Sequence, residues 1–211
     1  MNILAVGAHH DDIELGCSGT LAKLLKQGHN VFGIVLTDSV THYNLQGIYR
    51  TKNRIQSESR EAASVIGLEL VDLDFPLAKN GCLIYNVELM RELETFIVKQ
   101  DITTVFSHWK YDMNTDHKIA SEITIVASRH VKNVLMYRSN WYQPDKPFNG
   151  MFFCDISETM NLKIECLKKY VEEVDNRSEK WINSFIDMNR TYGFSIGVDY
   201  DEIFQPVRYI I

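Results

Sequence analysis

Apolar residues along the chain alternate between short continuous runs and stretches with helical spacing. Runs of strand length, rich in β-branched residues, occur at 2–7, 31–37, 69–75, 102–107 and 134–137. Between them, apolar and alanine positions recur every three or four residues, which predicts helices at 19–27, 51–66, 87–97 and 116–130. Strands that alternate with helices predict a mostly parallel sheet in a Rossmann-like, three-layer α/β/α sandwich.

The last third of the chain has a different pattern. One more strand is predicted at 151–156, followed by a helix from Ser157 whose apolar face continues to Val171. Trp181, Phe185 and Met188 indicate another helix, and residues 199–211 are expected to be irregular or short-stranded. No break in composition separates this part from the rest, so we expect a single domain over residues 1–211.

Composition narrows the classes of function. The 211 residues are 45% hydrophobic and 24% charged, as in an ordinary globular protein. A formal net charge of -6 without a basic stripe argues against nucleic-acid binding. No apolar run reaches the ~18–20 residues that cross a bilayer, so no membrane insertion is expected. The four cysteines show no paired spacing, and the N-terminus lacks a basic signal region; both favour reduced thiols and the cytoplasm.

Two polar clusters follow predicted strands. The first is the run His9-His10-Asp11-Asp12 after the first strand, and the second spans residues 108–117 (HWKYDMNTDH) after the fourth. In open α/β sheets, ligands bind at the carboxyl ends of the strands. Burying each such polar group without a partner would cost roughly 2–7 kcal/mol, so packing alone does not explain the clusters.

A divalent metal ion would give these side chains a common partner. Imidazole and carboxylate groups suit zinc, although other divalent metals are compatible with them. His9 and Asp12, three residues apart in a turn, can point the same way, and His117 can close the site from the second cluster. Three protein ligands leave one position open, which is typical of a catalytic zinc ion, here one per chain. Asp11 lies between two of the ligands and is placed to take a proton from water. The simpler alternative, a helix cap, needs one such residue and not four.

The two clusters resemble the motifs of the LmbE/PIG-L family of metal-dependent N-deacetylases. Residues 7–20 (GAHHDDIELGCSGT) are similar to its AHPDD run and the glycine-rich turn that follows, and residues 112–117 (DMNTDH) to its second motif. Weaker similarity continues at 54–67 and 202–208. The resemblance implies zinc held by His9, Asp12 and His117, with Asp11 as the general base and Asp116 as the partner that orients an imidazole. It also implies an LmbE-like fold and an N-acylated amino sugar, free or conjugated, as the small-molecule substrate.

Two positions depart from the family pattern. His10 replaces the proline of AHPDD, and Asn114 stands where many members have a histidine that stabilises the oxyanion. An asparagine amide can donate the same hydrogen bond but cannot act as an acid. His108 is the alternative source of an imidazole. The sequence leaves this choice open.

Further residues are predicted on the rim of the site. Asp38 lies at the end of the second strand and Asp74 at the end of the third, and Arg54 could bind a phosphate or a sugar hydroxyl. A surface role for Arg54 is an equally good interpretation. Two segments, 41–49 and the aromatic stretch 141–144, are candidate substrate-binding loops, because aromatic faces suit sugar rings; packing is the alternative for Trp141 and Tyr142.

Other functions fit the sequence less well. Two histidines and a carboxylate also describe non-haem iron oxygenases, but those usually have an all-β barrel. A dinucleotide-binding protein is disfavoured because no GxGxxG follows the first strand. A metal-dependent amidase with a non-sugar substrate and a non-catalytic carbohydrate-binding protein remain alternatives. The particular sugar, the acyl group and the oligomeric state stay open, although homo-oligomers are common in the family.

Overall fold

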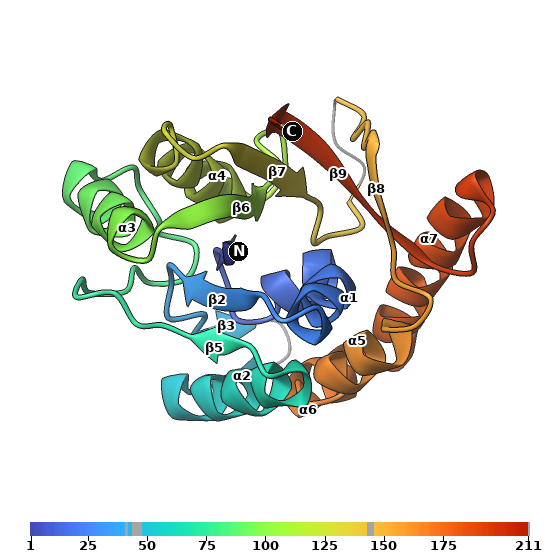
Figure 1. Cartoon of the computed structure of the whole chain (residues 1–211). Helices are drawn as coiled ribbons and strands as arrows, with labels where there is room; N and C mark the ends of the chain where they lie inside the picture. The colour runs from blue at the N-terminus through green and yellow to red at the C-terminus, as the bar shows by residue number, and fades with distance from the viewer. Residues whose placement is uncertain (41, 44–47, 143–145, 211) are drawn as a thin grey trace.

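A seven-stranded sheet with helices on both faces forms the body of the protein (Figure 1). The computed structural model describes residues 1–40, 42–43, 48–142 and 146–210. The strands of the sheet are β1 (Asn2–Gly7), β2 (Asn30–Val35), β5 (Glu69–Leu70), β6 (Ile102–His108), β7 (Asn133–Tyr137), β8 (Phe152–Asp155) and β9 (Asp201–Arg208). A separate antiparallel pair consists of β3 (His42–Tyr43) and β4 (Ile48–Tyr49). The helices are α1 (Asp12–Lys26), α2 (Lys52–Ile66), α3 (Val87–Lys99), α4 (Thr115–Ala127), α5 (Met160–Leu167), α6 (Val171–Arg177) and α7 (Lys180–Ile196).

The predicted mostly parallel sheet is confirmed. Its strand order is β5–β2–β1–β6–β7–β9–β8, and the five strands from β5 to β7 are parallel. Because β1 and β6 are neighbours, the two segments that follow them meet at one edge of the sheet. This is where the two polar clusters of the sequence lie.

Alternation along the strands divides the core between the two faces. On one face, Leu4 and Val6 of β1 pack with the apolar sides of α3 and α4. On the other, Ile3 and Ala5 pack with α1 and α2. Burial of both faces explains why β1 is a continuous apolar run rather than an alternating one.

The last third of the chain adds a smaller core outside α1 and α2. Cys166, Tyr170, Trp181 and Phe185, from α5, α7 and the turn between α5 and α6, pack against Leu15 of α1 and its neighbours. Figure 1 shows α5, α6 and α7 along the outer side of α1 and α2. The single helix expected from Ser157 to Val171 is two helices, because the chain turns at the buried Tyr170.

Two other predictions are corrected. The first helix begins at Asp12 and not at residue 19. Its two glycines, Gly16 and Gly19, weaken the helical signal in the sequence, but the structure needs them because neighbouring side chains pack closely against the helix. A Cβ on Gly16 would lie 2.1 Å from the Tyr137 ring. The C-terminal segment is not irregular: β9 has eight residues and pairs antiparallel with both β7 and β8. Its partners lie far away in the sequence, so local patterns do not reveal it.

Two expectations about the chain's chemistry can be compared with the structure. All four cysteines are free thiols, as predicted. Among the described residues, no helix is both long and apolar enough to cross a bilayer.

Asp201 on β9 generates a prediction about stability. Its side chain is buried, and burial, with the charges of Glu202 and Asp155 nearby, raises its pKa to about 7 from the usual 3.8. A raised carboxyl pKa means that the folded protein holds the proton more tightly than the unfolded chain. This carboxyl therefore removes stability as the pH rises from about 4 to about 7.

We expect Asp201→Asn to gain stability over the wild type as the pH rises. The difference in unfolding free energy should grow by about 2 kcal/mol between pH 5 and pH 8, measured by denaturant unfolding. Asp155, its exposed partner across β8 and β9, is the control: Ser157 lowers the pKa of Asp155 below its usual 3.8, so the effect of Asp155→Asn should change at acidic pH and stay nearly constant between pH 5 and pH 8. The same pH dependence of the unfolding free energy in both variants would contradict a raised pKa for Asp201.

Candidate active site

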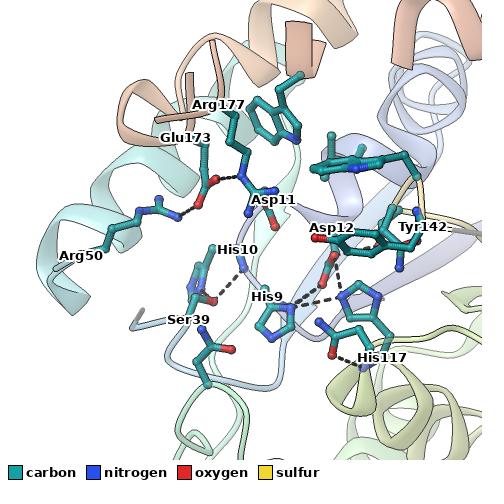
Figure 2. Close-up of a pocket in the computed structure, with 17 residues that line it drawn as sticks. His9, His10, Asp11, Asp12, Ser39, Arg50, His117, Tyr142, Glu173 and Arg177 are labelled. Atoms are coloured by element: carbon teal, nitrogen blue, oxygen red, sulfur yellow. Dashed lines mark hydrogen bonds and ion pairs between the residues drawn. The ribbon is translucent and has the colours of Figure 1, made fainter. Parts of the chain in front are cut away.

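A polar cavity of about 190 Å³ lies at the carboxyl ends of β1 and β6 (Figure 2). The His9–Asp12 turn and the start of α4 form its floor, and residues from the last third of the chain form the opposite wall. The described lining residues are His9, His10, Asp11, Asp12, Leu15, Ser39, Arg50, Asn80, Asn114, His117, Ser139, Asn140, Trp141, Tyr142, Glu173, Arg177 and Trp181.

Three of these residues bring ligand atoms together at the floor. Nδ1 of His9 lies 3.2 Å from Nε2 of His117 and 3.3 Å from Oδ2 of Asp12. Oδ1 of Asp12 lies 3.2 Å from the same His117 nitrogen. Metal–ligand bonds of about 2.0–2.2 Å at tetrahedral angles would place donors roughly 3.3 Å apart. The group His9, Asp12 and His117 therefore has the chemistry and the spacing to hold a metal ion.

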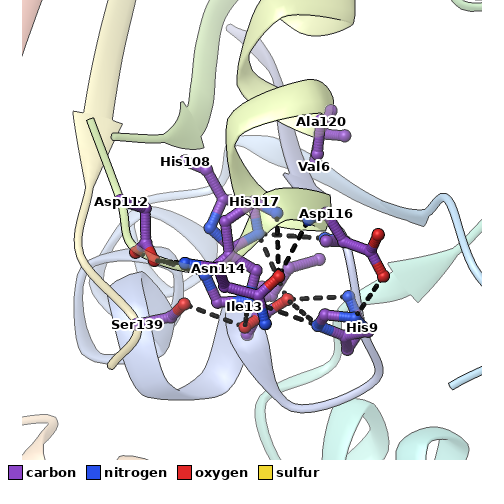
Figure 3. A network of polar contacts seen from close by, with 12 residues as sticks. Val6, His9, Ile13, His108, Asp112, Asn114, Asp116, His117, Ala120 and Ser139 are labelled. Carbon is purple, nitrogen blue, oxygen red and sulfur yellow. Dashed lines mark hydrogen bonds and ion pairs between the residues drawn. The ribbon is translucent and has the colours of Figure 1, made fainter. Parts of the chain in front are cut away.

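Figure 3 shows the polar network that includes His9, His117 and Ser139. Asp12 is its centre, because all three of these residues contact the Asp12 carboxylate. Its carboxylate is almost completely buried and accepts hydrogen bonds from the His9 backbone N–H (2.7 Å) and the Ser139 hydroxyl (2.8 Å). Although burial opposes ionisation, the neighbouring His117 and His108 hold the pKa of Asp12 well below its usual value. The side chain is thus kept as an anion, the form that binds a metal.

Each candidate histidine ligand has a carboxylate on its other ring nitrogen. Asp116 Oδ2 lies 3.0 Å from His9 Nε2, and Asp112 Oδ2 lies 3.2 Å from His117 Nδ1. Asp116 is itself held by the backbone N–H groups of Gly81 and Leu83. Burial lowers the histidine pKa values, but the carboxylates outweigh it and raise them to about 10 for His9 and about 9 for His117. Such partners set the ring orientation of metal-binding histidines.

Asp11 lies between the candidate metal ligands and a second charged group (Figure 2). Burial, the Asp12 carboxylate and Glu173 raise its pKa to about 8. Asp11 precedes α1 at the N-cap position, but its side chain makes no capping hydrogen bond. The Asp11 carboxylate therefore does not cap α1. Its raised pKa suits proton transfer near neutral pH.

The second charged group is centred on Arg50. This buried guanidinium contacts Glu58 of α2 at 3.0 Å, Glu172 of α6 at 3.0 Å and Glu173 of α6 at 2.5 Å. Arg177, one turn after Glu173, contacts the same glutamate. The group joins α2 to α6 across one side of the cavity.

The two candidates for oxyanion stabilisation occupy different places. Asn114 lines the cavity, and its side-chain oxygen caps α4 by accepting from the N–H groups of Asp116 (2.8 Å) and His117 (3.4 Å). His108 is fully buried, stacks on His117 and accepts the Ala8 N–H through Nε2. That same nitrogen lies 3.1 Å from Asp12. His108 is thus behind the candidate ligands, so the structure does not support the alternative that it faces an oxyanion.

Three predicted rim residues are not among the described lining residues. Asp38 uses Oδ1 to accept the N–H groups of Val40 and Asn80, so it shapes a loop. Asp74 is exposed. Arg54 is also exposed and contacts Glu172 at 3.1 Å and Glu58 at 3.6 Å, on the outer side of the Arg50 group. These placements do not support substrate contacts by Asp38, Asp74 or Arg54. Within the candidate loops, residues 41, 44–47 and 143–144 are outside the described residues.

Sequence reasoning missed several residues of the cavity. Arg50, Glu173, Arg177 and Trp181 reach it from segments without any motif, so only the fold reveals them. Asp112, by contrast, lies in the second cluster, where its spacing from His117 could have suggested a partner. His10 lines the cavity wall, and its Nδ1 lies 2.8 Å from the Ser39 hydroxyl. Burial, helped by the charge of His9, lowers the His10 pKa to about 4, so the ring is neutral.

Comparisons with known proteins agree with this site. A family described as PIG-L, GlcNAc-PI de-N-acetylase, matches residues 4–128. The uncharacterized deacetylase YaiS of Escherichia coli is 29% identical over 177 residues, which cover 80% of this chain and 89% of that protein. The diacetylchitobiose deacetylase of Thermococcus kodakarensis is 26% identical over 189 residues, covering 80% of this chain and 68% of that one.

Solved structures share the fold over the whole chain. The conserved protein TT1542 of Thermus thermophilus superposes with a TM-score of 0.82 at 25% identity, covering 99% of this chain and 95% of that one. GalB of Pseudomonas putida, a 4-carboxy-2-hydroxymuconate hydratase, has a TM-score of 0.78 at 17% identity over 100% of this chain and 97% of its own. The similarity to GalB shows a shared fold alone.

The carboxylate partners of the histidines generate a test of the metal site. We expect Asp112→Asn to weaken binding of Zn²⁺ or Co²⁺ by about 10- to 100-fold, because His117 loses the charge that orients it. Competition with a chelator of known affinity measures this. Asp74→Asn, an exposed aspartate outside the cavity, is the matched control and should bind as the wild type does. Unchanged affinity in Asp112→Asn would show that this carboxylate does not support a metal ligand.

Proposed function

This chain belongs to the PIG-L family, and on that premise we propose that it is a zinc-dependent N-deacetylase that removes a short N-acyl group from an amino sugar or its conjugate. One observation carries the proposal. His9 Nδ1 and His117 Nε2 lie 3.2 Å apart, each lies 3.2–3.3 Å from one oxygen of the Asp12 carboxylate, and the neighbouring carboxyl of Asp11 has a pKa raised to about 8. Named relatives of the chain are deacetylases, which are hydrolases of amide bonds.

The donor set supports zinc as the metal, one ion per chain. Two imidazoles and one carboxylate leave room for water and substrate, as in catalytic zinc sites. When bound, such an ion supplies positive charge that polarises an amide carbonyl and lowers the pKa of water. His9, Asp12 and His117 would hold it. Asp116 and Asp112 would keep the two rings in the orientation that binding needs.

In the proposed reaction, Asp11 moves the protons. Its carboxylate takes a proton from the attacking water, and the oxygen of that water adds to the amide carbon. The Asn114 side-chain NH₂, whose oxygen partner is occupied with the α4 cap, can donate to the developing oxyanion. Asp11 then returns its proton to the nitrogen as the C–N bond breaks. The products are a short carboxylic acid, which ionises in water, and a free amine.

The wall of the cavity supports a sugar as the substrate. Trp141 and Tyr142 are about half exposed beside the buried Trp181, and the Arg177 guanidinium lies over the Trp141 ring at 5.2 Å. Aromatic faces beside hydrogen-bonding groups match the apolar faces and hydroxyls of a sugar ring. Diacetylchitobiose is the substrate named for one relative, which supports amino sugars as the first compounds to test.

The substrate class is tested by a panel. The metal-loaded protein should release amine and acetate in equal amounts from N-acetylglucosamine compounds: the free sugar, diacetylchitobiose and nucleotide or lipid conjugates. N-acetyl amino acids test the alternative of a non-sugar amidase, and 4-carboxy-2-hydroxymuconate tests hydration, the activity named for one protein with this fold. Release of amine from acetyl amino acids alone would exclude the sugar substrate. Metal binding without turnover on the whole panel would favour a carbohydrate-binding protein.

The role of Asp11 is tested by Asp11→Asn. The variant should keep the metal but lose about 10²- to 10⁴-fold in kcat, because its amide cannot accept the proton. Metal content by elemental analysis, together with kcat and KM, measures both effects. Asp38→Asn, a nearby aspartate that does not line the cavity, should keep wild-type kcat. A metal-loaded Asp11→Asn enzyme with wild-type turnover would exclude Asp11 as the base.

A further inference from the structure

A buried ion pair lies beside the middle of α1, outside the cavity. Lys163 of α5 and Glu202 of β9 are 0% and 1% exposed, and their Nζ and Oε1 atoms are 2.6 Å apart. Both residue types are rarely buried completely. Glu202 belongs to the C-terminal segment 202–208, which resembles the family but has no part in the chemistry described above. The pair therefore requires its own explanation.

Both members of the pair bind the backbone of α1. Lys163 Nζ donates to the Leu15 carbonyl at 2.7 Å, and Glu202 accepts the N–H groups of Gly19 at 3.1 Å and Thr20 at 2.7 Å. In a regular α-helix the Gly19 N–H would donate to the Leu15 carbonyl. The ion pair thus contacts both ends of one main-chain hydrogen bond of the helix. The ion pair therefore restrains the main chain of α1 and not merely one of its side chains.

The contact at Leu15 is one turn away from the proposed catalytic residues. The Leu15 N–H donates to the Asp11 carbonyl at 2.9 Å, so a single residue, Leu15, links Lys163 to the backbone of Asp11. Asp12 is the first residue of α1, and Leu15 itself lines the cavity. A displacement of α1 along its axis would move Asp11 and Asp12 together relative to His117, which lies on a different helix.

Apolar packing also restrains α1 at this point, but its contacts are less directional than hydrogen bonds to charged groups. Gly16 and Gly19 present bare backbone, because a Cβ would meet the Tyr137 ring at 2.1 Å and the Ile156 side chain at 2.8 Å. Without side chains there are no ridges to interlock with neighbouring elements. A buried ion pair adds little net stability compared with apolar residues, but its bonds are directional. Its contribution is therefore to geometry.

We propose that Lys163 and Glu202 are positioning residues that fix the register of α1, and so place Asp12 and Asp11 opposite His117. This inference rests on the proposed metal site. In this role, strand β9 of the C-terminal segment supports the site from outside the cavity. The residues act through the α1 backbone and do not touch the substrate.

The test uses Glu202→Asp in the otherwise unchanged chain. The change keeps the buried charge pair but shortens the carboxylate by one methylene, so the fold should survive while the position of α1 shifts. We expect Zn²⁺ or Co²⁺ affinity to fall about tenfold and kcat to fall with little change in KM. In the metal-free protein, the Gly19 and Thr20 amides should exchange with deuterium faster than in the wild type. A second variant, Lys163→Met with Glu202→Gln, removes both charges and should show larger changes of the same kind.

The control is Arg208→Met, on the same strand. Arg208 donates to the carbonyls of Val131 and Ser128, far from α1, so its loss should lower the Tm without changing metal affinity. A purely structural role for the pair predicts that Glu202→Asp behaves in the same way. Wild-type metal affinity, kcat and amide exchange in folded Glu202→Asp would overturn the proposal. If the wild type binds no metal and has no deacetylase activity, the proposed function fails instead, and exchange at Gly19 and Thr20 still reports whether the pair holds α1.

Discussion

The buried carboxylate of Asp12 is the constraint on which the rest of the site depends. An anion without contact to water needs several partners, and Asp12 finds them in the His9 backbone, the Ser139 hydroxyl and three imidazoles. These partners come from the turn after β1, the end of β6, the start of α4 and the segment after β7. The fold must therefore bring four distant segments to one point. The pairing of β1 between β2 and β6 does most of this.

Two adjacent carboxyls with opposite properties follow from that arrangement. Asp12 contacts the histidines, which hold its pKa well below the usual value, whereas burial, the Asp12 charge and Glu173 raise the pKa of Asp11 to about 8. Carboxyl groups whose environments separate their pKa values in this way can divide the work of catalysis. One is suited to remain charged and bind a cation, and the other to accept and return a proton.

The last third of the chain completes the site from two sides. Inside the cavity, α6 and α7 contribute Glu173, Arg177 and Trp181, which surround Asp11 and face the space for substrate. Outside it, α5 and β9 supply Lys163 and Glu202, which bind the α1 backbone. Residues 4–128, which match the family, contain the candidate metal ligands but none of these groups. Differences in substrate among relatives of the same fold can thus arise in the C-terminal part without changing the metal site.

The sequence by itself determined the layered α/β fold and the candidate metal ligands, because both depend on local patterns: apolar runs, helical spacing, and polar residues directly after a strand. Only the tertiary structure decided what surrounds them. The sequence left open whether Arg54 contacts the substrate or lies on the surface. In the structure Arg54 is exposed, and Arg50, just before α2, lines the cavity because it pairs with Glu172 and Glu173 of α6. His108, the last residue of β6, lies behind Asp12 because it is buried between His117 and Tyr137. Strand β9 and the Lys163–Glu202 pair were hidden because every partner they have is distant in the chain.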